Sequence, residues 1–323
     1  MGYDFFMVLE QKASTDLFRD NKNIDKYRYI PLEVTDSNPD GLPLGMVKDT
    51  YKGKEYMGFT CAACHTNQIN YKGTAIRVDG APTLADMETF IEDLAKALKD
   101  TLENEKKKKR FVAAVMKRNP WSKMFSWGRR EYSSEEAVAK DLKKFTFQVE
   151  SYVSINKSVF DKNGKSGNLE YGYGRLDAFG RIYNRTLQNV LNRDSVEAAL
   201  KEVIPSEKLP HDLKRILNGT HDGSGVNKNK IITDSQFDYI LTEIRKKKLL
   251  TGPQLKKLKE NLFNSPNAPV SYPFLWDTPQ ADYVQWNGIS ANAGLGPIGR
   301  NVGEVIGVFG TLDWKKQKGF KGC

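Results

Sequence analysis

The feature that most constrains this chain is the pentapeptide Cys61-Ala62-Ala63-Cys64-His65. Two cysteines three positions apart can add their thiols across the two vinyl groups of one haem, and a histidine that follows directly can place an imidazole nitrogen beneath the iron. The chain has three cysteines and three histidines in 323 residues, so by chance this spacing arises on the order of once in several thousand such chains. The motif therefore predicts one covalently attached haem c, with Cys61 and Cys64 as the attachment residues and His65 as an axial iron ligand.

Two other kinds of CxxC site stay open as alternatives. A redox-active CxxC is typical of a βαβ context, which the flanking sequence does not suggest. A zinc site needs further ligands, and the residues left for that role are His211, His221 and Cys323, none of which shows paired ligand spacing. We expect both of these histidines at the surface, and Cys323 has no assigned role.

Composition and charge exclude several broad classes of protein. With 39% apolar and 28% charged residues, the chain is typical of a folded globular protein rather than a collagen-like or disordered one. The net charge of +10 includes basic runs at 106–110 and 245–248, which we expect to be solvated helix ends, with steering of an acidic redox partner as an alternative. No nucleic-acid recognition motif accompanies the charge. No apolar run approaches the roughly 20 residues that a membrane-spanning helix needs, and the first residues do not form an export signal.

The pattern of apolar residues predicts a mainly helical chain. Residues 1–60 are turn-rich, and we expect them to be irregular with short helices. Helices are predicted from Thr83 to about Arg118, from a capping box at Ser133 through Tyr152, around 181–203, and as a hairpin over Asp234–Lys248 and Pro253–Phe263. The segment 205–230 and the chain after residue 265 are predicted to be loops.

Several further stretches resemble one family. They are Gly41–Met46, Tyr56–Ile69 around the motif, Gly172–Phe179, Trp276-Asp277, Gln285–Gly288 and Arg300–Val308. In these stretches the chain is similar to the large two-haem cytochrome c family that includes bacterial di-haem peroxidases and, more closely, the rubber oxygenases.

The resemblance implies a mainly α fold, a cytochrome c-like haem domain with long helical and loop extensions. It implies irregular structure over 1–60, a haem core over about 50–203 and an extension over 204–323. Members carry a second CxxCH downstream that passes electrons, and this chain has none. We therefore expect the chain to be the N-terminal haem portion of a longer two-haem protein.

The resemblance also implies roles for residues outside the motif. It places Phe179 and Trp286 in a distal catalytic pocket and Arg175 and Arg300 at the cofactor, with Asp177, Trp276, Asn287 and Asn301 as further candidate walls of the haem pocket. Each has a structural alternative, because Arg and Asp often pair with one another and Trp is commonly a core residue.

These observations predict a haem-dependent oxidoreductase, periplasmic or secreted, that activates peroxide or oxygen at an iron bound by His65. Its expected partners are a redox protein or second haem domain and a small-molecule oxidant. A simple carrier needs only about 100 residues, whereas roughly 260 residues follow the motif. The alternatives are a single-haem electron-transfer module without catalysis and a thiol oxidoreductase that uses Cys61 and Cys64.

Overall fold

The computed structural model describes residues 1–118, 131–156, 169–177, 180–217, 230–284, 288, 290–308 and 310. The chain divides into two compact units, each built from several stretches of sequence. Unit 1 comprises Met1–Val153, Glu170–Leu176 and Pro269–Asn292, and unit 2 comprises Ser154–Leu169, Asp177–Ala268 and Ala293–Cys323.

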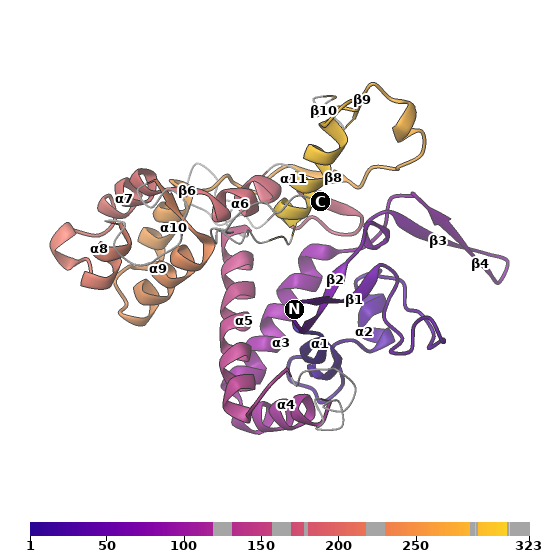
Figure 1. Cartoon of the computed structure of the whole chain (residues 1–323), viewed down its shortest axis with the longest axis horizontal. Coiled ribbons are helices and arrows are strands. Elements are labelled where there is room, and N and C mark those ends of the chain that lie inside the picture. Colours follow the sequence, from indigo (N-terminus) through magenta and orange to yellow (C-terminus); the bar gives the residue numbers. More distant parts are fainter. Residues whose placement is uncertain are drawn as a thin grey trace. The chain divides into compact units, whose positions relative to one another are not determined.

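The helices of unit 1 surround an aromatic core. They are α1 (Tyr3–Val8), α2 (Asn21–Lys26), α3 (Met87–Glu103), α4 (Glu105–Arg118) and α5 (Glu135–Asn156). The last three residues of α5, from Ser154 on, belong to unit 2. The Lys99 ammonium lies 3.3 Å from the Glu150 carboxylate and joins α3 to α5, which run side by side (Figure 1). Phe90 of α3 is fully buried. Its ring lies 5.2–6.0 Å from the rings of Phe18, Tyr27, Tyr29 and Phe59.

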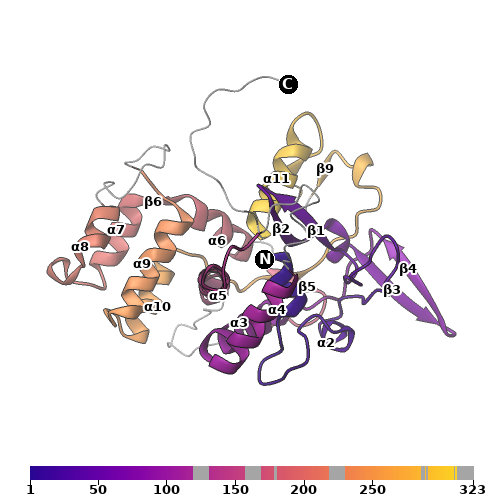
Figure 2. The ribbon, with the colours of Figure 1, turned by 60° about the horizontal axis from the view of Figure 1, so that its bottom comes forward.

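One β-hairpin precedes the CAACH motif and a second follows it. The first pairs β1 (Met46–Tyr51) with β2 (Lys54–Phe59), and the second pairs β3 (Thr66–Tyr71) with β4 (Thr74–Asp79), both antiparallel. Each turn is Tyr-Lys-Gly, with positive φ at both central residues: 50° and 76° at Lys52-Gly53, and 46° and 82° at Lys72-Gly73. Such primed turns match the twist of the paired strands. The β3–β4 hairpin extends away from the rest of unit 1 (Figures 1 and 2).

The remaining elements of unit 1 are short; one lies near the middle of the chain, with its last residue in unit 2, and the others lie within residues 269–291. They are β5 (Arg175–Asp177), which pairs with β8 (Pro269–Ser271), the 3-10 turn η4 (Thr278–Gln280), and β9 (Tyr283–Val284) paired with β10 (Ser290–Ala291). These elements bring residues about 200 positions downstream back to the CAACH region.

Unit 2 is a helical assembly with little strand. Its elements are α6 (Gly180–Asn189), β6 (Leu191–Asn192), α7 (Arg193–Lys201), the 3-10 turn η3 (Ser206–Lys208), α8 (His211–Leu217), β7 (Ile231–Ile232), α9 (Asp234–Lys246), α10 (Gly252–Glu260) and α11 (Gly296–Val308). Helices α7 to α10 lie together (Figure 2), and β6 pairs with β7. Both α9 and α10 begin with a capping box, Thr233 with Gln236 and Thr251 with Gln254, which satisfies their first amide groups.

The expected fold class is wrong. About 50% of the described residues are helical and 16% are in strands, and they mix helices with small two-stranded sheets rather than forming a mainly α cytochrome c-like domain. The expectation failed around the motif, where residues 46–59 and 66–79 form two hairpins, although residues 1–60 were expected to be irregular with short helices. The exposed hairpins bury almost no side chains, so their strands lack the alternation of apolar and polar residues that would have indicated them.

Several of the longer predicted helices are present in the structure. The pair α9 and α10 confirms the predicted helical hairpin, and α5 confirms the helix predicted after residue 133. The cap was predicted at Ser133, but it is the hydroxyl of Ser134 that accepts the hydrogen bond from the Ala137 amide. The single helix predicted from Thr83 is two helices, because Asn104 is extended at φ −92° and ψ 109°. Helix α11 occupies a region predicted to be loop.

Candidate functional site

The CAACH motif forms one tight turn between the two hairpins. Cys61–Ala63 are a turn of 3-10 helix, η1, and the His65 amide donates to the Cys61 carbonyl oxygen at 2.8 Å. A hydrogen bond from residue i+4 to residue i closes one helical turn, so Cys61 and His65 lie on the same side of the turn. Phe59, at the end of β2, packs its ring on Phe90 and thereby ties the start of this turn to the aromatic core.

Gly45 makes the close packing of this turn possible. Its φ is +78°, and its carbonyl accepts the Thr60 amide at 2.8 Å. A Cβ at this position would fall on the backbone nitrogen and Cα of Ala63 and lie 2.8 Å from the carbonyl carbon of Ala62. Glycine is therefore required both by the dihedral angle and by the approach of the motif's backbone.

His65 is oriented by a residue far away in the sequence. Its Nδ1 lies 2.9 Å from the backbone carbonyl oxygen of Pro273, 208 positions along the chain. A carbonyl oxygen can only accept a hydrogen bond, so Nδ1 carries the proton and Nε2 keeps its lone pair. Metal-binding histidines are commonly held in this way, with one ring nitrogen donating to a carbonyl while the other binds the metal.

The two cysteines differ in their surroundings. Neither forms a disulfide, Cys61 is exposed, and Cys64 is half-buried. Burial raises the pKa of the Cys64 thiol to about 12, and the neighbouring Cys61 adds to the shift. A cysteine that attacks disulfides works as its thiolate, so the half-buried Cys64 is poorly suited to be an attacking thiol.

Exposed apolar side chains lie beside the turn. The Thr83 amide donates to the Cys64 carbonyl at 3.1 Å, and the next residue, Leu84, is exposed. Directly after Pro273, the rings of Phe274 and Trp276 stack with centroids 5.7 Å apart, and both are exposed. A haem attached to Cys61 and Cys64 needs apolar side chains against its faces, and Leu84, Phe274 and Trp276 are exposed side chains of this kind in unit 1. The residues present therefore fit a covalently attached haem.

The other sequence-predicted residues that the structure describes are divided between the two units. Arg175 is an exposed residue at the start of β5 in unit 1, whereas Arg300 and Asn301 lie on α11 in unit 2. Asp177 is fully buried and structural, because its carboxylate accepts the amides of Arg181 at 3.4 Å and Ala268 at 3.0 Å. The predicted residues Phe179, Trp286 and Asn287, together with His221 and Cys323, lie outside the described residues.

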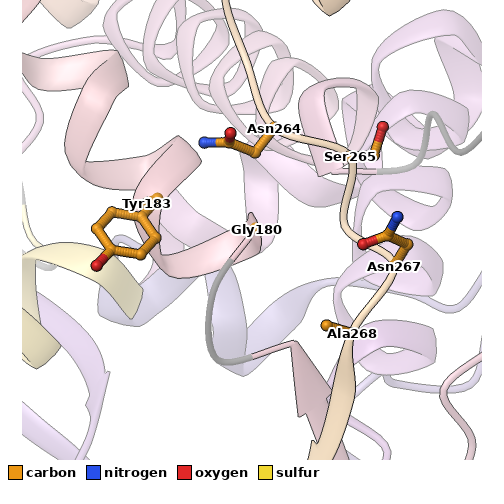
Figure 3. Close-up of a pocket in the computed structure, with 6 residues that line it drawn as sticks. All are labelled: Gly180, Tyr183, Asn264, Ser265, Asn267 and Ala268. Atoms are coloured by element: carbon orange, nitrogen blue, oxygen red, sulfur yellow. The ribbon is translucent and has the colours of Figure 1, made fainter. Parts of the chain in front are cut away.

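A separate pocket lies in unit 2, with a cavity of about 550 Å³. Figure 3 shows Tyr183 and Gly180 of α6 on one side and Asn264, Ser265, Asn267 and Ala268 of an extended segment on the other. Asn184 fixes that segment, since its side chain accepts the Asn264 amide at 2.8 Å and donates to the Asn264 carbonyl at 2.9 Å. None of the lining residues is charged, and the pocket contains none of the residues predicted for the haem site.

The described part of the chain offers no further candidate of two kinds. No group of three or more His, Cys, Asp or Glu side chains is placed to hold a metal ion there. Nor is any helix in that part both long enough and apolar enough to cross a membrane.

The structure adds three residues that the sequence did not assign to the motif's support: Gly45, Pro273 and Gly80. Gly45 lies in the stretch Gly41–Met46, whose two glycines near two prolines were a visible turn signal. Pro273 acts through its backbone carbonyl, which has no sequence signal at all. Trp276, an expected wall of the haem pocket, also donates its indole N–H to the Asp79 carbonyl at 2.9 Å.

Comparison with known proteins gives one similar chain. An uncharacterized protein of Sinorhizobium fredii, y4iJ, is 25% identical over an alignment of 338 positions that takes in 98% of this chain and 42% of that protein. No family model and no solved structure matches the chain. The chain thus spans less than half the length of this relative.

Proposed function

We propose that this chain binds one haem c covalently through Cys61 and Cys64, with His65 as an axial iron ligand, and is the haem-bearing part of an oxidoreductase that acts on oxygen or peroxide. The observation that carries the proposal is the geometry of His65. Its Nδ1 donates to the Pro273 carbonyl, which leaves Nε2 available on the side of the turn that also carries Cys61.

The chain's own residues would prepare the site in three ways. Gly45 lets the backbone of the turn at Ala62 and Ala63 pack closely against the start of the first hairpin. Pro273 fixes the tautomer and orientation of the imidazole. Leu84, Phe274 and Trp276 supply apolar surface beside the turn. When bound, haem supplies an iron centre that can exchange electrons and, if its sixth position is open, can bind oxygen or peroxide.

A carrier that only relays electrons is the second candidate. Size favours the enzyme, because roughly 260 residues follow the motif and a carrier needs about 100. The thiol oxidoreductase alternative is disfavoured because the motif lies between two antiparallel hairpins and not in the βαβ context typical of such enzymes. Because haem c is attached after export, the proposal also places the protein in the periplasm or outside the cell.

The experiment is expression of the chain with an export signal in a host that matures haem c, followed by a haem stain after denaturing electrophoresis. We expect covalent haem in the unchanged protein and none in the Cys61→Ala, Cys64→Ala double variant. His65→Ala should alter the absorption spectrum of the haem, whereas the control His211→Ala should not, since that side chain is 85% exposed on α8. Unchanged protein without covalent haem would refute the proposal.

Optical spectra then separate enzyme from carrier. A high-spin ferric spectrum that shifts on adding cyanide or peroxide indicates an open iron site, as an oxygen- or peroxide-activating enzyme requires. A low-spin spectrum that neither reagent changes would contradict the enzyme and support the electron carrier.

A further inference from the structure

The segment Pro273–Trp276, here called the strap, is fastened across the start and end of the second hairpin. Three hydrogen bonds hold it. His65 Nδ1 donates to Pro273 O at 2.9 Å, the Leu275 amide donates to Gly80 O at 2.8 Å, and Trp276 Nε1 donates to Asp79 O at 2.9 Å. All of these residues belong to unit 1.

The strap and the hairpin form a closed arrangement around His65. The Gly80 amide donates to the His65 carbonyl at 2.8 Å, so the residue that receives the strap is itself bonded to the backbone of the histidine. His65 is therefore held at its backbone by Gly80 and at its ring by Pro273. The carbonyl of Pro273 can change its position only if the strap moves, and the strap is anchored beyond Leu275 by the Trp276 indole.

Trp276 is specifically suited to this anchor. An indole N–H is a donor only, and here it donates to the backbone carbonyl of Asp79. The residue opposite must be small, because a Cβ on Gly80 would lie 3.0 Å from Nε1 and 3.2 Å from Cδ1 of Trp276. The ring is 47% exposed, so burial alone does not explain a tryptophan at this position.

We propose that Trp276 is a positioning residue that sets the orientation and donor strength of His65 as an iron ligand by anchoring the strap. This inference rests on the proposed function, since it assigns a role only if His65 binds haem iron. A hydrogen bond from Nδ1 to a carbonyl makes the imidazole a stronger electron donor, which stabilises ferric over ferrous iron. Loosening the strap weakens that bond and raises the reduction potential.

The expected size follows from what such supporting contacts do elsewhere. Loss of a residue that orients a metal ligand typically weakens metal binding about 10- to 100-fold. If the preference for ferric over ferrous iron falls tenfold, the reduction potential rises by about 59 mV for a one-electron couple. A shift of tens of millivolts is therefore the predicted outcome.

The test compares Trp276→Phe with Tyr283→Phe in the haem-loaded chain. Trp276→Phe keeps an aromatic ring for the stack on Phe274 and removes the N–H. Tyr283 lies in β9 of the same C-terminal stretch and is 63% exposed, so its change should leave the potential within error of the unchanged protein. Haem content, from the pyridine haemochrome spectrum, should stay the same in both variants, because neither touches Cys61 or Cys64. A redox titration should show a rise only in Trp276→Phe.

Two outcomes overturn the inference and are distinguishable. Unchanged protein that holds no covalent haem refutes the proposed function and this role with it. Full haem content in Trp276→Phe with an unchanged potential refutes this role alone. If Trp276→Phe does not fold, as judged by circular dichroism, Trp276→Leu replaces it: this variant also removes the indole N–H, so an unchanged potential in it also refutes the role.

Discussion

Replacing Gly45 with alanine is the sharpest test of how the motif is packed, because the hairpin next to it offers a matched control. Gly45 and Gly53 have nearly the same φ, +78° and +76°. They differ in their surroundings: nothing lies within 4 Å of a Cβ on Gly53, whereas a Cβ on Gly45 would overlap the backbone of Ala63. The pair therefore separates the cost of the dihedral angle from the cost of the close approach.

The magnitudes follow from these two terms. A non-glycine residue in the left-handed region costs about 1–3 kcal/mol, and this applies to both variants. Forcing an added methyl group into occupied space costs typically about 1–3 kcal/mol more, and this applies only to Gly45→Ala. At about 2–4 °C per kcal/mol for a domain of 150–250 residues, Gly45→Ala should unfold about 2–12 °C below Gly53→Ala.

The assay is thermal and urea-induced unfolding of the haem-free protein, followed by circular dichroism, for both variants and the unchanged chain. Equal losses of stability in the two variants would refute the close approach of Gly45 to the motif. In the haem-loaded protein, covalent haem should fall in Gly45→Ala and not in Gly53→Ala, because only the first variant displaces the turn.

Three further predictions concern the rest of the chain. Phe90→Ala empties the centre of the aromatic core and should lower the free energy of unfolding by about 3–5 kcal/mol in urea titrations; a loss below about 1 kcal/mol would contradict that packing. Arg118→Ala leaves the buried Asp4 carboxylate without its 2.8 Å partner and should cost about 1–3 kcal/mol in the same assay, with Arg118→Lys intermediate. Burial, with a contribution from Arg245, lowers the pKa of Lys259 from 10.5 to about 8. Between these values the folded protein binds fewer protons than the unfolded chain, so its free energy of unfolding should rise with pH relative to Lys259→Gln; a difference that is flat from pH 7 to 10 would contradict this.

Local sequence was enough to predict the features whose causes are local. The CAACH spacing identifies its residues without any knowledge of the fold, because five consecutive residues carry the whole pattern. The helical hairpin of α9 and α10 was also predictable, since its capping residues and apolar faces lie within single helices. The repeated Tyr-Lys-Gly at 51–53 and 71–73 is also a local signal, and it marks the turns of the two hairpins that the apolar pattern did not predict.

The support of the motif depended on the tertiary structure. Pro273 holds His65 through a backbone carbonyl 208 positions away, and any residue type has such a carbonyl. The resemblance implied that Trp276 is a wall of the haem pocket, and only the fold shows that its N–H also donates to the Asp79 carbonyl. The sequence by itself determined the spacing of Cys61, Cys64 and His65 on which the proposed haem site rests. Only the folded chain decided how the imidazole among them is oriented, because that orientation rests on backbone groups brought together from distant segments.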